Sequence, residues 1–272
     1  VRARAAARDT RQWRCTRAAM DDLQLLRYSR HILLDELGPD AQARFAAAHA
    51  LIVGVGGLGA PAAQFLAAAG IGRITLCDAD HVDLTNLQRQ ILFATADVGA
   101  RKVDAAAARL SAINPEVAIE RIDARVGDAE LAPLVARASI VLDCSDNFAT
   151  RHAVNRACVK ARVPLVSGAA LRFDGQLAVF DARDPASPCY HCLFGEGDDL
   201  EETRCATMGV FAPLVGIIGA GEAAEALKLV AGAGESLAGR LLMLDALTMR
   251  WHEVRVPRDP QCPVCGTAAD QS

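Results

Sequence analysis

Three glycines at the spacing Gly-x-Gly-x-x-Gly could hold the phosphates of a nucleotide. Gly54, Gly56 and Gly59 belong to the stretch VGVGGLGAP, between an apolar run and an alanine-rich run. Glycines at this spacing allow a tight turn, expose backbone N–H groups and bring a helix N-terminus close to an anion. Asp78 comes 19 residues after Gly59, where a carboxylate can accept hydrogen bonds from ribose hydroxyls. The pattern fits NAD and ATP equally.

The segment that follows Asp78 favours ATP. Asn86, Arg89 and Gln90 lie in DLTNLQRQILF, and Lys102 opens the next alanine-rich run. A triphosphate carries more charge than the pyrophosphate of a dinucleotide, and a reaction at its α-phosphate accumulates still more, so it needs fixed cations. Arg89 and Lys102 are candidates for these cations, although single residues of this kind are often solvated surface charges.

Two carboxylates follow another apolar run, in the stretch SIVLDCSDN. Asp143 ends this run and Asp146 comes three residues later. Strands of a parallel sheet end at one edge, where ligands of such folds bind, so one of the two could hold Mg²⁺. The alternative for Asp146 is that it caps the next helix.

Four cysteines form two Cys-x-x-Cys pairs, typical of a structural zinc site. Cys189 and Cys192 lie in CYHC, and Cys262 and Cys265 lie in CPVCG. Two such pairs from distant parts of one chain match a tetrahedral Cys₄ zinc site with no position left for water. We expect His191, inside the first pair, to be a bystander. Three other cysteines fall within or beside apolar runs, and we expect them in the core: Cys77, Cys144 and Cys158.

These residues need a framework that brings them to one edge, and the alternation of apolar runs with helical patterns predicts one. We expect a Rossmann-like, doubly wound, mostly parallel α/β sheet with an antiparallel C-terminal extension and a structural zinc site. The predicted strands are Ala50–Gly54, Arg73–Asp78, Glu116–Ile122, Ser139–Asp143, Pro164–Ser167, Gly175–Asp181, Leu241–Asp245 and Arg250–Val256. The predicted helices are Leu58–Ala69, Lys102–Ile113, Ala129–Arg137, Asn147–Arg162 and a helix from about Pro213 to Ala231.

Composition limits the class of protein. The chain has 272 residues, of which 52% are hydrophobic, and a formal net charge of -4, which argues against a general nucleic-acid binder. A membrane-spanning helix needs about 18–20 consecutive apolar residues, and no stretch of the sequence approaches this length. Residues 1–19 contain six arginines and one aspartate but no apolar core, so we interpret them as a disordered tail or an extension upstream of Met20 rather than a secretory signal. The cysteine content without a secretory signal favours a reducing, cytoplasmic location.

Seven motifs together give a resemblance that the glycine loop alone does not. From about Arg27 to Gly266 the chain resembles the E1-like adenylyltransferases that activate bacterial sulfur carriers, the molybdopterin-synthase and thiazole-biosynthesis group. The motifs are RYSRHILL, GVGGLG, LTNLQRQ, VLDCSDN, PLVSGAALRFDGQ, CYHC and CPVCG. Their order and number exclude the dehydrogenase that a glycine loop by itself would suggest.

The resemblance implies cofactors and a role for each matching residue. Members of the family bind ATP and Mg²⁺ and adenylate the C-terminal glycine carboxylate of a small ubiquitin-like protein, releasing pyrophosphate. It implies that Gly57 lies against the phosphates and that Asp78 holds the ribose. Arg89 and Lys102 would neutralise the phosphates, and Asp146 would bind Mg²⁺.

Three further residues receive roles from the resemblance. Arg30 matches an arginine that reaches the active site of a neighbouring subunit, which implies a homodimer. Asn86 would be a further nucleotide contact. Cys205 corresponds to a cysteine on a crossover loop, here about residues 193–212, which in some relatives forms a covalent acyl bond with the carrier and in others is dispensable. Arg204 beside Cys205 would favour the thiolate.

The expected function is ATP-dependent adenylation of a sulfur-carrier protein with a C-terminal Gly-Gly. We favour the small subunit of molybdopterin synthase, and the alternative is the thiazole carrier with a covalent acyl-cysteine step. A tRNA-modifying relative and an inactive carrier-binding scaffold remain as alternatives of other classes. Residues 20–272 are expected to form one adenylation domain, with an ATP-binding half at about 50–180 and a zinc tail at about 257–266. The sulfur donor is expected to be a separate protein, such as a cysteine desulfurase or a rhodanese.

Overall fold

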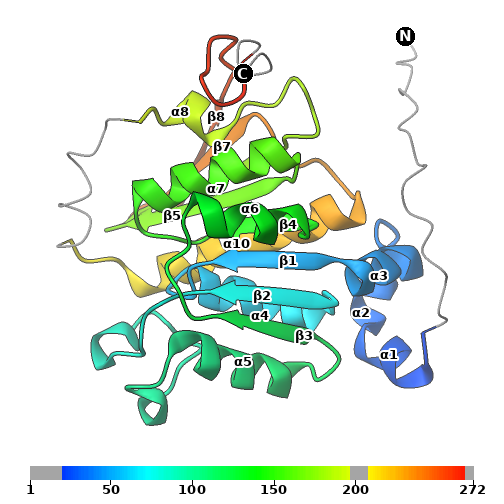
Figure 1. The fold of residues 1–272 in the computed structure, drawn as a ribbon. Coiled ribbons are helices and arrows are strands. Elements are labelled where there is room, and N and C mark those ends of the chain that lie inside the picture. The colour runs from blue at the N-terminus through cyan, green and yellow to red at the C-terminus, as the bar shows by residue number, and fades with distance from the viewer. Residues whose placement is uncertain (1–19, 197–207, 267–272) are drawn as a thin grey trace.

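The described residues form an α/β fold around one mixed sheet (Figure 1). The structure is a computed structural model, and it describes residues 20–196 and 208–266. The eight strands of the sheet lie in the order β3-β2-β1-β4-β5-β6-β7-β8. Neighbouring strands from β3 to β5 are parallel, and those from β5 to β8 are antiparallel. Their bounds are β1 His49–Val53, β2 Arg73–Cys77, β3 Ala118–Ile122, β4 Ile140–Asp143, β5 Leu165–Leu171, β6 Asp174–Phe180, β7 Arg240–Asp245 and β8 Arg250–Arg255.

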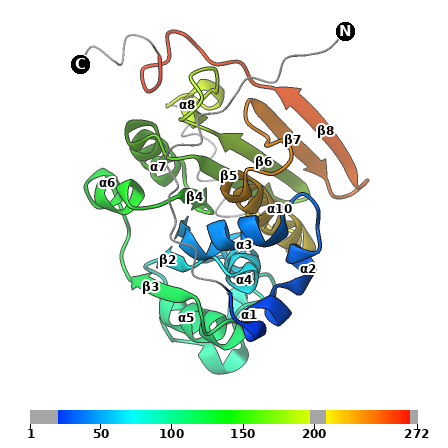
Figure 2. The same ribbon diagram turned by 90° about the vertical axis from the view of Figure 1, so that its right-hand side faces the viewer.

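Helices cover both faces of the sheet, so its central strands are apolar on both sides. Figure 2 shows α6 and α7 on one side and α3, α4 and α10 on the other. All five residues of β1 are buried, as expected for the middle of a parallel sheet. The helices of the described residues are α1 Asp22–Arg27, α2 Ser29–Ile32, α3 Gly38–Ala47, α4 Gly59–Ala69, α5 Lys102–Ile113, α6 Asp128–Ala136, α7 Phe148–Ala161, α8 Tyr190–Leu193 and α10 Ala212–Ala231, with short 3₁₀ turns at Leu84–Asn86 and Thr95–Asp97.

The chain turns in opposite directions from two neighbouring strands, which creates a binding edge. The connection that leaves β1 leads to β2 on one side, and the connection that leaves β4 leads to β5 on the other. In open α/β sheets, ligands bind at the carboxyl ends of the strands at such a switch point. The glycine loop follows β1 there, and the segment of residues 144–147 follows β4.

The first three helices were not predicted, and they lie at the opposite edge of the sheet (Figure 1). Tyr28, between α1 and α2, is buried and packs beside Gly70 at the end of α4. Its hydroxyl donates to Glu116 Oε2 at 2.9 Å and accepts from Asn114 Nδ2 at 2.9 Å. These contacts fix α1 and α2 near the amino ends of β2 and β3. A capping box starts α1, but the positions of α1 and α2 depend on partners 86 and 88 residues away.

The predicted strands and helices are all present, with one strand extended, and the short helix α8 and two 3₁₀ turns are additional to them. The strand predicted at Pro164–Ser167 continues to Leu171 as β5, because its second half pairs with β6 in an antiparallel hairpin. Two predicted regions, residues 1–19 and most of the crossover loop, lie outside the described residues. Within the described part of the chain, no helix combines the length and the apolar character that a membrane crossing needs.

Candidate active site

The glycine loop is shaped by close backbone contacts, which explains why its residues must be small. Gly54 has φ 91°, and a Cβ there would lie 2.7 Å from the carbonyl oxygen of Cys144. A Cβ on Gly59 would lie 1.9 Å from the carbonyl oxygen of Gly54. A side chain at either position would therefore push the loop away from the end of β4 or from the start of α4. Gly59 acts on the shape of the loop and does not line the cavity.

Asp78 connects the end of β2 to this loop. One of its carboxylate oxygens accepts from the backbone N–H of Val55 at 2.8 Å, and the other accepts from the N–H of Asp80 at 2.8 Å. Burial raises the pKa of Asp78, and the nearby charge of Lys102 acts in the opposite direction. The carboxylate is thus held at the cavity wall, in the place predicted for a ribose contact.

Lys102 is buried at the first position of α5 and faces a partner that the sequence did not indicate. Its Nζ lies 2.8 Å from Asp80 Oδ2, and this contact is the main cause of a lowered pKa of Asp80. Both residues line the cavity. The ammonium group is therefore positioned at the wall by a carboxylate that is itself largely exposed.

Of the three polar residues predicted in this segment, the structure brings two to the cavity. Arg89 lines it, and its Nη1 donates to the carbonyl of Thr85 at 3.3 Å. Asn86 does not line it; its carbonyl accepts the N–H groups of Arg89 and Gln90 instead. The nucleotide contact predicted for Asn86 stays a prediction, and the cavity wall of this structure does not include that residue. Gln90, by contrast, is buried and lines the cavity.

The two carboxylates after β4 have different environments. Asp143 is fully buried, accepts from Ser145 and Ser167, and lies 3.6 Å from Arg151. Asp146 is exposed at the cavity wall. The cap of α7 is Asn147, whose side chain accepts from the N–H of Thr150 at 2.9 Å, and not Asp146. Asp146 is therefore the carboxylate that can meet a ligand.

These residues surround one cavity of about 1060 Å³ at the switch point. Seven of the predicted site residues line it: Gly54, Gly56, Gly57, Asp78, Arg89, Lys102 and Asp146. Sequence reasoning missed Asp80, Arg125 and Arg151 in its wall. Arg151 is a buried cation that donates to the carbonyls of Ser145 and Gly168, and its position in the first turn of a helix gave no sign of this.

Arg30 does not lie at this cavity. It belongs to α2, at the other edge of the sheet, and it is exposed (Figure 1). Within one subunit Arg30 therefore does not contribute to the site. Cys205 and Arg204 lie outside the described residues.

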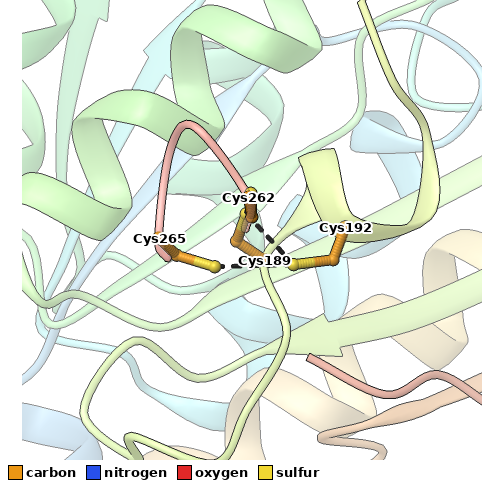
Figure 3. A group of neighbouring side chains, drawn as sticks. All are labelled: Cys189, Cys192, Cys262 and Cys265. Carbon is orange, nitrogen blue, oxygen red and sulfur yellow. Dashed lines mark hydrogen bonds between the residues drawn. The ribbon is translucent and has the colours of Figure 1, made fainter. Parts of the chain in front are cut away.

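The four cysteines predicted to bind zinc converge at the end of α8 (Figure 3). Their sulfur atoms all lie within 4.8 Å of one another. The separations are 3.9 Å for Cys189–Cys192, 3.7 Å for Cys189–Cys262 and 3.4 Å for Cys192–Cys265. Four thiolates at the usual Zn–S distance of about 2.3 Å on a tetrahedron would be about 3.8 Å apart. The cluster therefore fits a zinc ion.

The surrounding contacts hold the two halves of this cluster in place. Asn155 of α7 accepts from the N–H of Tyr190 at 2.9 Å and donates to Cys189 Sγ at 3.6 Å. Arg258 donates to the carbonyls of Pro185 and Cys265, joining the last segment to the loop before α8. The C-terminal segment is thus attached, through α8, to the middle of α7.

The other described cysteines are core residues, as predicted. Cys77, Cys144 and Cys158 are buried, and burial raises the pKa of each thiol, that of Cys77 to about 12. Such thiols are unreactive because the thiolate is disfavoured.

The fold and this edge define a class of protein: a nucleotide-binding α/β protein of the Rossmann type, with antiparallel strands added at its C-terminal side. The sequence model of the ThiF family matches residues 28–264 of the chain, so the chain belongs to this family. It is an adenylyltransferase, the enzyme class of its curated relatives.

Two relatives and one solved structure illustrate the similarity. Molybdopterin-synthase adenylyltransferase of Escherichia coli (strain K12) is 47% identical over 252 residues, 92% of this chain and 99% of the relative. Sulfur carrier protein ThiS adenylyltransferase of the same organism is 42% identical over 247 residues, 91% of this chain and 97% of the relative. The crystal structure of E. coli MccB with ATP has a TM-score of 0.78 and 27% sequence identity, covering 88% of this chain and 73% of MccB.

Proposed function

We propose that this protein uses ATP and Mg²⁺ to adenylate the C-terminal glycine carboxylate of a ubiquitin-like sulfur-carrier protein with a Gly-Gly end, releasing pyrophosphate. The observation that carries the proposal is the composition of the cavity wall. Two cationic side chains, Arg89 and Lys102, stand beside a glycine loop, with the carboxylates of Asp78 and Asp146 in the same wall. Curated relatives named as adenylyltransferases of molybdopterin synthase and of a sulfur carrier support it.

The chemistry needs positioning and charge more than proton transfer. A glycine carboxylate is ionised at neutral pH, so it attacks the α-phosphorus without a general base. Negative charge then builds up on the phosphate oxygens and on the departing pyrophosphate, where fixed cations lower the barrier. In keeping with this, the described lining of the cavity contains no histidine. Mg²⁺ bound by Asp146 would add Lewis-acid stabilisation of the phosphate oxygens.

As the particular carrier we propose the small subunit of molybdopterin synthase. The relative named for that enzyme is 47% identical and is matched over 99% of its length. The relative named for ThiS is matched over 97% of its length at 42% identity, so the thiazole carrier is the second candidate.

We further propose that the protein acts as a homodimer in which Arg30 enters the cavity of the neighbouring subunit. Two features of the single chain support this arrangement. Arg30 lies at the wrong edge of the sheet to serve its own cavity. The helices around it also expose apolar side chains that another copy could cover: Leu23, Leu26, Leu33 and Leu34.

The Cys₄ cluster is proposed to hold one Zn²⁺ with a structural role. Its four sulfur ligands complete a tetrahedron and leave no position for a reacting water. Bound zinc would link the C-terminal segment to α8 and, through Asn155, to α7.

Carrier-dependent exchange of labelled pyrophosphate into ATP tests the function. The proposal expects exchange with a purified carrier that ends in Gly-Gly and none with a carrier that lacks the last glycine. Exchange that depends on a tRNA would instead indicate the RNA-modifying alternative. Tight carrier binding without any exchange would indicate the inactive scaffold.

Cys205 distinguishes direct sulfur delivery from a covalent acyl step. We expect Cys205→Ala to leave pyrophosphate exchange nearly unchanged, because adenylation needs only ATP, Mg²⁺, the carboxylate and fixed cations. Direct attack of an external sulfur donor on the acyl-adenylate predicts thiocarboxylate at the wild-type rate in the variant. Mass spectrometry of the carrier after incubation without reductant provides the measurement. A reductant-sensitive adduct on Cys205 that turnover requires would overturn this expectation and favour the thiazole-type mechanism.

A further inference from the structure

A second group of metal-ligating side chains lies beside the Cys₄ cluster and shares none of its residues. It consists of His152 on α7, His191 on α8 and Glu196, whose donor atoms all lie within 4.8 Å of one another. The predicted role of His191 was that of a bystander inside the first cysteine pair. In the structure the imidazole of His191 lies outside the Cys₄ cluster, as that prediction expects, and belongs to this second group.

The three side chains face one another from two elements. The imidazole rings of His152 and His191 meet edge to face, with centroids 5.6 Å apart. Nδ1 of His152 lies 3.9 Å from Oε1 of Glu196. Nδ1 of His191 is buried and has no hydrogen-bond partner among the residues that the structure describes. Such a nitrogen is available to a ligand that enters the group.

The donor set suits a divalent transition metal ion. Two imidazoles and one carboxylate are ligands that Zn²⁺ accepts in a tetrahedral site, with water in the fourth position. Ligand atoms at about 2.0–2.2 Å from such an ion lie about 3.3–3.6 Å apart. The separation of 3.9 Å between Nδ1 of His152 and Oε1 of Glu196 is slightly larger, and the side chain of Glu196 is 53% exposed and can move inward.

The local charge also favours a cation. Arg156 approaches Glu196 at 2.5 Å, but it donates as well to both carboxylate oxygens of Asp128 at 3.0 Å. One guanidinium group is thus shared by two carboxylates, so its single positive charge does not neutralise both. A divalent ion beside Glu196 would supply the missing positive charge while Arg156 keeps Asp128.

We propose that His152, His191 and Glu196 form a second metal site, for a divalent transition metal ion such as Zn²⁺, distinct from the Cys₄ site. Its ligands join α7 to α8 next to the cavity, since Arg151, Tyr190 and Phe194 line the cavity wall. The site goes beyond the proposed adenylation, and its existence does not depend on that reaction.

Metal binding to the full chain with zinc already in the Cys₄ site provides the test, with Co²⁺ as the probe. Wild-type protein is expected to bind one equivalent of Co²⁺ without losing zinc, and to show visible d–d bands without the charge-transfer band of a cobalt thiolate. Glu196→Gln and His152→Asn should each weaken this binding at least about tenfold, as expected for the loss of a metal ligand. His191→Gln should do the same, and its retained zinc content is measured because His191 lies between two cysteines.

His252→Gln is the matched control, because His252 is exposed on β8 and belongs to neither group. It should bind Co²⁺ as the wild type does. Absence of a second metal equivalent in the wild type would overturn the proposal. So would binding that displaces the zinc, or binding that Glu196→Gln leaves unchanged.

Discussion

At the scale of single residues, the charges at the cavity are held in place before any ligand is present. Lys102 is buried, and Asp80, largely exposed, keeps its ammonium group at the wall at 2.8 Å. Asp78 is fixed by two backbone N–H groups, one from the glycine loop. Groups that are already oriented cost little reorganisation when charge develops in a reaction. The sequence predicted Lys102 and Asp78 as site residues, but it did not predict the partners that hold them in place.

Arg89→Ala should lower carrier-dependent pyrophosphate exchange by roughly 10²–10³-fold, or about 3–4 kcal/mol, because it removes one fixed donor to developing charge. The variant should keep its folded far-UV spectrum. Arg109→Ala is the control, since Arg109 is an arginine of α5 that pairs with Asp97 and does not line the cavity. Full exchange by Arg89→Ala, or tight binding of NAD by the wild type, would contradict the nucleotide assignment.

At the scale of elements, two short segments carry most of the geometry: the glycine loop and the C-terminal cysteine loop. Each depends on a contact made far along the sequence, the first with Cys144 and the second with α8. A substitution in either segment therefore tests the contact on which that segment depends.

Gly54→Ala should destabilise the protein more than Gly99→Ala. Both glycines have positive φ, 91° and 87°, so each substitution costs about 1–2 kcal/mol of backbone strain. The Cβ at position 54 would also meet the carbonyl of Cys144 at 2.7 Å, whereas the one at position 99 meets nothing within 4 Å. Overpacking of this kind adds about 1–3 kcal/mol. Urea unfolding measures the difference, and equal losses for the two variants would refute the argument.

Cys262→Ser should release the zinc and lower the unfolding free energy by more than about 2 kcal/mol, similar to the loss of a native cross-link. Cys262 is buried and its Sγ lies 3.7 Å from Cys189 Sγ. Elemental analysis and thermal unfolding of reduced protein give the two readouts. Cys158→Ala, a buried cysteine on α7 outside the cluster, should keep its zinc. Wild-type protein without zinc would contradict the assignment.

At the scale of the whole molecule, Arg30 distinguishes two models, an active monomer and an obligate dimer in which Arg30 serves the neighbouring subunit. Arg30→Ala and Asp146→Ala should each be inactive as homodimers, and a mixture refolded together should recover activity. In a mixed dimer, one site would contain an intact Asp146 and the partner's intact Arg30. Pyrophosphate exchange of the refolded mixture is the measurement. If Arg30 served its own cavity, both sites of the mixed dimer would remain defective and no activity would return.

The central sheet and the cysteine cluster were predictable because both follow from local sequence patterns. Apolar runs such as ALIVG and SIVLD specify buried strands, and the Cys-x-x-Cys spacing identifies ligands whatever their separation. The extension of β5 and the positions of the helices α1 and α2 were not predictable in this way. They depend on an antiparallel partner strand and on hydrogen bonds to Asn114 and Glu116.

By itself, then, the sequence determined the fold class and the residues of the glycine loop, and it predicted a ribose carboxylate, two phosphate cations and four zinc ligands. Only the tertiary structure decided which of the polar residues face the cavity. It turned Asn86 away, buried Asp143 against Arg151, paired Lys102 with Asp80 and placed His191 beside His152. The physical reason is the same in each case: residue type and spacing restrict what a side chain can do, whereas its direction and its partners follow from contacts between segments distant in the chain.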